Sequence, residues 1–242
     1  MHSKNHTTSP QNLQTHVVEK FTLIYVTLFT LLGVYLAVFN QSYFDTKYTL
    51  EDGFLEWLTF VSLSTIAATF FYRCCVYAPH KNKMFFVITL FISLLFIFGA
   101  GEEISWGQRL FAIESSDFFL ENNAQNETNL HNLVVNGVKI NQLLFGKGLA
   151  LIFLIYLGIM TPLYNKKPGF AAFIDRCGIP IPQTYQAFAY LITLICVEVI
   201  IKNYSDTGRR GELTEFSVSF IVMLNLVFPK NIHIYSKNKY FP

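Results

Sequence analysis

Long apolar runs separated by polar segments dominate the pattern of this chain. Charged residues are rare within the runs, which cover residues 21–39, 54–77, 84–101, 148–165, 184–201 and 213–229. A helix needs about 20 mostly apolar residues to cross the hydrocarbon core of a membrane. The pattern therefore predicts an all-α fold, a polytopic transmembrane helical bundle of about six spans.

The polar segments divide the chain into three parts. Residues 1–20 are predicted to form an N-terminal tail, residues 21–229 a membrane domain, and residues 230–242 a C-terminal tail. The membrane domain includes a long polar loop at residues 102–147, between the third and fourth runs. An amphipathic helix lying on the membrane surface is predicted within this loop, before the fourth run, from the spacing of Leu130, Leu133, Val134, Val138 and Leu144.

Basic and acidic residues are distributed unequally between the two sides that six spans would create. The segments at 1–20, 73–83, 166–183 and 230–242 hold 11 of the 18 basic residues but only 2 of the 16 acidic ones. Cytoplasmic loops of membrane proteins carry an excess of Lys and Arg. We therefore expect both termini in the cytoplasm and the acidic residues on the extracytoplasmic side.

Composition supports a membrane protein rather than a soluble domain. Hydrophobic residues make up 52% of the chain, charged residues 14%, and the mean hydropathy is +0.37. A soluble domain of this length needs more charged surface. The net charge of +2 gives no reason to expect a nucleic acid partner. The apolar runs make membrane lipids the expected partners.

Carboxylates at the ends of two apolar runs are the first candidates for chemistry. Glu56 lies inside the second run, and Glu102 and Glu103 end the third. Carboxylates embedded in a membrane are costly and usually functional. Glu102, Trp106 and Arg109 follow at helical spacing, which would allow a Glu–Arg pair on one face. A structural, salt-bridged corner is the alternative to a binding or catalytic corner.

A polar segment downstream holds the one histidine expected on the acidic side. Glu127 and His131 are four residues apart, so on a helix they could bind one metal ion or one substrate group. A surface Glu–His pair is the alternative reading. Together with Glu103, they are the candidate ligands of a divalent metal whose identity the sequence does not give.

The last acidic segment contains two adjacent arginines. Arg209 and Arg210 could hold a phosphate or neutralise the acids around them, and Glu198 is expected to pair with one of them. The candidate catalytic residues are then Glu102, Glu103, Glu127 and His131. The candidate substrate-binding residues are Glu56, Trp106, Gln108, Arg109, Arg209, Arg210 and Glu215.

Three strings resemble those of a bacterial family of largely uncharacterised multi-pass membrane proteins. They are EDGFLEW at 51–57, GEEISWGQR at 101–109 and NETNLHN at 126–132. The resemblance extends over most of the chain and implies a bacterial inner membrane setting. It brings no activity with it.

Three functional hypotheses remain open from the sequence. The first is a membrane hydrolase or transferase that acts on a lipid, lipid-linked or anionic substrate from the extracytoplasmic side. The second is a non-catalytic scaffold or sensor subunit whose polar corner binds a partner. The third is an ion- or proton-coupled transporter, although the acids cluster on one side and trace no path through the membrane.

Overall fold

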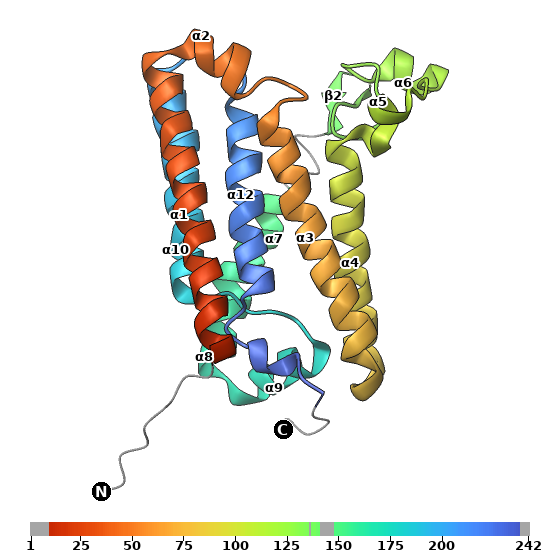
Figure 1. The fold of residues 1–242 in the computed structure, drawn as a ribbon, viewed down its shortest axis with the longest axis vertical. Helices are drawn as coiled ribbons and strands as arrows, with labels where there is room; N and C mark the ends of the chain where they lie inside the picture. The colour runs from red at the N-terminus through yellow and green to blue at the C-terminus, as the bar shows by residue number, and fades with distance from the viewer. Residues whose placement is uncertain (1–9, 136, 141–147, 238–242) are drawn as a thin grey trace, which may run out of the picture.

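A computed structural model describes residues 10–135, 137–140 and 148–237 of the protein. These residues are mostly helical, which confirms an α-helical fold, and the one small sheet among them has two strands of two residues each. The helices form an elongated bundle in which most of them run along the long axis (Figure 1).

Four helical stretches are long and apolar enough to cross a membrane. They are Val17–Phe39, Phe54–His80, Lys83–Glu103 and Thr184–Tyr204. The first belongs to α1 (Pro10–Phe39), the second to α3 (Phe54–Val76) and η2 (Ala78–His80), and the third is α4 (Lys83–Glu103). The fourth is composed of α10 (Thr184–Leu194), η6 (Ile195–Ile201) and α11 (Lys202–Tyr204). An integral membrane protein is therefore indicated.

The other two predicted spans are helical but do not reach this length and hydropathy. Residues 148–165 fall mainly in α7 (Leu149–Ile155), η5 (Tyr156–Met160) and α8 (Thr161–Lys166). The last run falls in α12 (Arg210–Val227), which begins with three charged residues in its first six positions. The count of six spans therefore stays a prediction.

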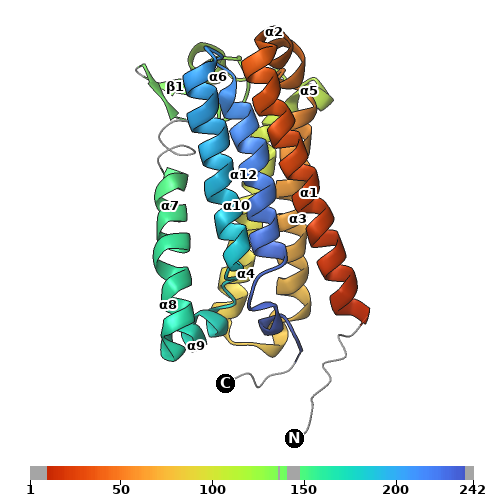
Figure 2. The same ribbon diagram turned by 90° about the vertical axis from the view of Figure 1, so that its left-hand side faces the viewer.

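Helix α12 lies in the middle of the bundle and is its most buried helix. It packs against α1, α3 and α10 (Figures 1 and 2). Leu213, Phe216 and Leu224 are fully buried within it. Since α12 contacts α1, α3 and α10, van der Waals packing against it fixes where these flanking helices stand. Its first residues consequently lie among the ends of the surrounding helices.

The loop that follows α4 is compact and has little regular structure. It contains η3 (Ser105–Gly107), α5 (Gln108–Phe111), α6 (Asp117–Asn122), β1 (Val134–Val135) and β2 (Val138–Lys139). Across the bundle at the same end lie α2 (Gln41–Tyr43) and η1 (Phe44–Tyr48) (Figure 1).

The predicted amphipathic helix at 130–144 is wrong for the part that the structure describes. Val134 pairs with Lys139 and Val135 with Val138 in an antiparallel hairpin. Gly137 has a φ of 76°, which a turn between two such strands favours, and β-branched valines suit strands. Leu144 lies outside the described residues.

The two ends of the bundle differ in character. The start of α1 lies at one end with α8, α9 (Pro168–Cys177) and η7 (Ile232–Ile234), and the loop after α4 lies at the other (Figures 1 and 2). At the first end Arg73 is buried and donates to the backbone oxygens of Leu226 and Val227, at 2.7 and 2.8 Å. These bonds satisfy carbonyls at the end of α12 that have no partner within the helix.

Candidate functional site

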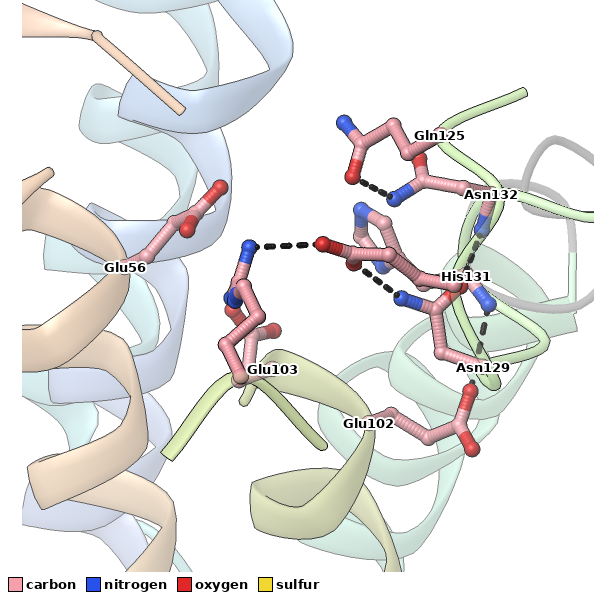
Figure 3. Close-up of a pocket in the computed structure, with 9 residues that line it drawn as sticks. Glu56, Glu102, Glu103, Gln125, Asn129, His131 and Asn132 are labelled. Carbon is pink, nitrogen blue, oxygen red and sulfur yellow. Dashed lines mark hydrogen bonds and ion pairs between the residues drawn. The ribbon is translucent and has the colours of Figure 1, made fainter. Parts of the chain in front are cut away.

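A small polar pocket lies where α3, α4 and the loop after α4 meet. It is lined by Glu56, Glu102, Glu103, Arg109, Gln125, Glu127, Asn129, His131 and Asn132. Figure 3 shows Glu56 on α3 facing the loop residues Gln125, His131 and Asn132 across the pocket. Carboxylates, amides and one imidazole dominate the lining, so the pocket suits a cation or a polar group.

Glu102 holds the loop against the end of α4. Its side chain is buried, and one carboxylate oxygen accepts the backbone N–H groups of Leu130 and His131, at 2.5 and 3.1 Å. The other oxygen accepts the indole N–H of Trp106 at 2.9 Å. Three donors offset the cost of burying this carboxylate. Glu102 is thus occupied with positioning the chain that carries His131.

Glu103, His131 and Glu215 form a cluster that could hold a metal ion. One ligand atom from each lies within 4.8 Å of the others, and all three residues are half-buried. The His131 Nε2 and a Glu215 carboxylate oxygen are 3.6 Å apart. Two ligands on a tetrahedral zinc with bonds near 2.1 Å lie about 3.4 Å apart, so small side-chain movements would complete a site.

The Glu103 carboxylate is short of positive partners. Within the described ranges it makes no hydrogen bond or ion pair, and four further carboxylates act on it, those of Glu56, Glu102, Glu212 and Glu215. Crowded carboxylates disfavour one another's ionised forms unless a cation lies between them. This crowding is what a bound divalent cation would relieve.

The imidazole of His131 is suited to act as a ligand. Burial lowers its pKa from the ordinary value, and the carboxylates of Glu212 and Glu102 oppose this effect. A neutral imidazole keeps a lone pair on one ring nitrogen for a metal. His131 therefore fits a ligand role at neutral pH better than the role of a fixed positive charge.

Glu127 lies in the same pocket but belongs to a different network. Its carboxylate accepts from Ser105 Oγ at 2.5 Å, from Arg109 at 2.9 Å and from Asn129 at 3.1 Å. On a helix Glu127 and His131 would share one face, but this segment is a turn-rich loop. Its turns are held by Asn123, which donates to the side chain and backbone of Asn129 at 2.8 and 3.0 Å.

The Glu102–Arg109 pair that helical spacing would allow is also not formed. Ser105, Trp106 and Gly107 have φ values of 47°, 56° and 77°, which end the helix before Arg109. Arg109 pairs instead with Asp52 and Glu127. Gln108 donates to Ser115 Oγ at 2.6 Å and accepts the Thr128 N–H at 2.7 Å, so it closes the loop on itself.

The two adjacent arginines neutralise acids around the end of the bundle. Arg210 lies 2.8 Å from Glu198, which confirms the expected pair, and Arg209 lies 3.4 Å from Glu51. In this structure both arginines are therefore paired with acids, and phosphate binding by them stays a prediction. Glu56 accepts the backbone N–H of Asp52 at 2.7 Å, which ties the turn before α3 to the first turn of the helix.

Three positioning residues were not among the sequence candidates. Ser105, Asn123 and Asn129 are buried and organise the loop through their hydrogen bonds. Their signal in the sequence is only a local excess of Asn between residues 122 and 132, which is typical of turns.

No protein-family model, curated protein or solved structure matches the chain.

Proposed function

We propose that this protein is an integral membrane enzyme that uses a divalent metal ion to act on a lipid or lipid-linked substrate. The observation that carries the proposal is the cluster of Glu103, His131 and Glu215. The three residues come from α4, the following loop and α12, so they meet only in the folded protein.

Two carboxylates and one imidazole match the ligand preferences of zinc, manganese or iron. Such an ion supplies Lewis-acid chemistry and lowers the pKa of a bound water. Among this chain's own residues, Glu56 lies across the pocket from His131. These features favour a hydrolase or a transferase.

The arrangement of charge also bears on the substrate. Arg109, Arg209 and Arg210 each have a carboxylate partner, so their charge is already balanced. An anionic head group would therefore be held by the metal ion, with Arg109 in the lining of the pocket. A lipid substrate fits because the pocket lies at the ends of α3 and α4, two of the helices able to cross a membrane.

The proposal includes a topology. Helices α7–α8 and α12 run alongside the four long apolar stretches (Figure 2), which supports six spans. The excess of Lys and Arg in the segments at the other end supports a cytoplasmic position for both termini. The pocket would then face the extracytoplasmic side of a bacterial inner membrane.

A scaffold or sensor function is the second candidate. The observation that favours it is the hydrogen-bond network of Ser105, Asn123, Glu127 and Asn129, which is satisfied within the loop itself. A loop held this firmly could present a fixed surface to a partner protein without any chemistry.

Metal content of the purified protein separates the two. We expect about one zinc, manganese or iron per chain in the wild type, and loss of it in Glu103→Gln, His131→Gln and Glu215→Gln. Glu121→Gln is the matched control, because Glu121 is an exposed acid of α6 that does not line the pocket. Each variant must elute as a monodisperse species from size exclusion. If the wild-type protein binds none of these ions, even after dialysis against them, the proposed metal-dependent enzyme is contradicted. The scaffold or sensor function then remains.

A further inference from the structure

Large apolar side chains are exposed along the segment that follows the pocket helix α4. Among them Phe111 is 74% exposed and Leu110 61%. The full set is Trp106, Leu110, Phe111, Ile113, Phe118 and Leu120. We refer to residues 106–120 as the apolar lip. In water such a concentration of apolar surface is unfavourable, so something covers it.

The lip is continuous with a surface that faces lipid. α4 is one of the stretches able to cross a membrane, and it exposes Phe91, Leu94 and Leu95 along its length. The ring of Phe98, near the end of α4, contacts the ring of Trp106 with centroids 5.7 Å apart. The exposed apolar surface of α4 therefore passes without interruption into the lip.

The position of the lip fits the membrane boundary. Figure 1 shows α5 and α6 at the pocket end of α4, projecting sideways from the bundle. Lipid beside α4 would therefore lie under the lip. Trp106 donates its indole N–H to Glu102 at 2.9 Å while its ring is half exposed, as expected of an interfacial tryptophan.

Charged residues set the depth of the lip. Glu114 and Asp117 are exposed within it, and Glu121 follows directly. Residues 113–116 are not helical, so part of their backbone needs water or head groups as partners. The lip therefore suits the boundary between head groups and acyl chains, where amphipathic segments lie, and not the hydrocarbon core.

We propose that the apolar lip is inserted into the lipid leaflet at the pocket end, at the level between head groups and acyl chains. The acids make a zwitterionic leaflet a better fit than an anionic one. If the proposed function also holds, this placement puts the pocket beside lipid head groups, and a head group could enter laterally from the leaflet.

Tryptophan fluorescence can test this directly, because the chain has only two tryptophans, Trp57 and Trp106. In the variant Trp57→Phe/Trp106→Phe/Phe111→Trp, the sole tryptophan reports on the tip of the lip. The protein is reconstituted in phosphatidylcholine vesicles, with and without brominated acyl chains. The control carries Asp206→Trp in the same background, at an exposed position of the loop before α12.

We expect brominated lipid to quench the lip tryptophan several-fold more than the control, and acrylamide to quench it less. Equal acrylamide quenching of both, without quenching by lipid, would place the lip in water and overturn the proposal. Protection from both quenchers would show a protein surface covering the lip and would equally overturn it. If the triple variant does not fold, the quenching of Trp57→Phe/Phe111→Trp is compared with that of Trp57→Phe. The difference between the two is the contribution of the tryptophan at position 111. Metal content of the wild-type protein in the same vesicles reports separately on the proposed function, because the wild type keeps the bond from Trp106 to Glu102.

Discussion

The backbone N–H of His131 donates to the carboxylate of Glu102, 3.1 Å away, and the N–H of Leu130 donates to the same oxygen. Glu102 precedes Glu103 in the chain, and Glu103 belongs to the candidate metal cluster with His131. Two adjacent carboxylates on one helix therefore have different tasks. One positions the loop, and the other is a candidate metal ligand.

Replacing Glu102 should weaken metal binding without removing a ligand. We expect Glu102→Ala to lower the affinity for the metal about 10- to 100-fold, as is typical when a group that orients a ligand is lost. Glu102→Gln should retain most of the affinity, because the amide oxygen can still accept both backbone N–H groups. Titration of the apo protein with zinc in competition with a chelator measures this. Equal losses in both variants would mean that the carboxylate charge matters and not its hydrogen bonds.

Glu127 and Glu215 should behave differently when replaced. Glu127→Ala removes an acceptor from Ser105 and Arg109, so we expect a loop that trypsin or chymotrypsin cleaves faster, with metal stoichiometry kept. Glu215→Ala should lose the metal and keep the loop resistant. Metal analysis and limited proteolysis of the two variants distinguish a residue that holds the loop from a residue that binds the metal. Loss of the metal in Glu127→Ala, with the metal kept in Glu215→Ala, would instead make Glu127 a metal ligand, as its spacing from His131 suggests.

The pattern of apolar residues predicts the long helices correctly, because the thickness of the hydrocarbon core fixes the length and the apolar composition of a spanning helix. The apolar runs correctly located α1, α3, α4 and the α10–α11 stretch. The pattern was insufficient for the loop. Of the three residues with positive φ that end the helix after α4, only Gly107 is of a type that signals it, whereas Ser105 and Trp106 are not.

The ligand set of the candidate site shows the same limit. The sequence suggests Glu127 as a ligand because it lies four residues from His131, a spacing that matters only on a helix. Glu215 comes close to His131 because α12 packs in the centre of the bundle, against α1, α3 and α10. Contacts of this kind depend on tertiary packing, which local spacing does not encode.

Arg73 should be important for stability at the opposite end of the bundle. Besides its bonds to Leu226 and Val227, its guanidinium lies 3.7 Å from the centroid of the Tyr235 ring. We expect Arg73→Met to lower the free energy of unfolding by about 2–4 kcal/mol, since charged hydrogen bonds and a cation–π contact are lost and buried carbonyls remain. Thermal unfolding in detergent measures this. Arg176→Met is the control, because Arg176 is exposed, and it should change the stability by less than about 0.5 kcal/mol. A similar loss in both variants would contradict a specific role for Arg73.

Asn225 should be a site where a substitution stabilises the protein. It is fully buried in α12, and neither its amide nitrogen nor its amide oxygen has a hydrogen-bond partner in the described part of the chain. Burying an unsatisfied amide costs about 1–3 kcal/mol, and leucine has the same number of side-chain heavy atoms without polar ones. We therefore expect Asn225→Leu to raise the unfolding temperature in detergent, and Asn225→Ala to raise it less because a cavity remains. If Asn225→Leu instead lowers the unfolding temperature, the amide has a partner in the membrane-embedded protein, and a ligand or water held at α12 becomes the explanation to pursue.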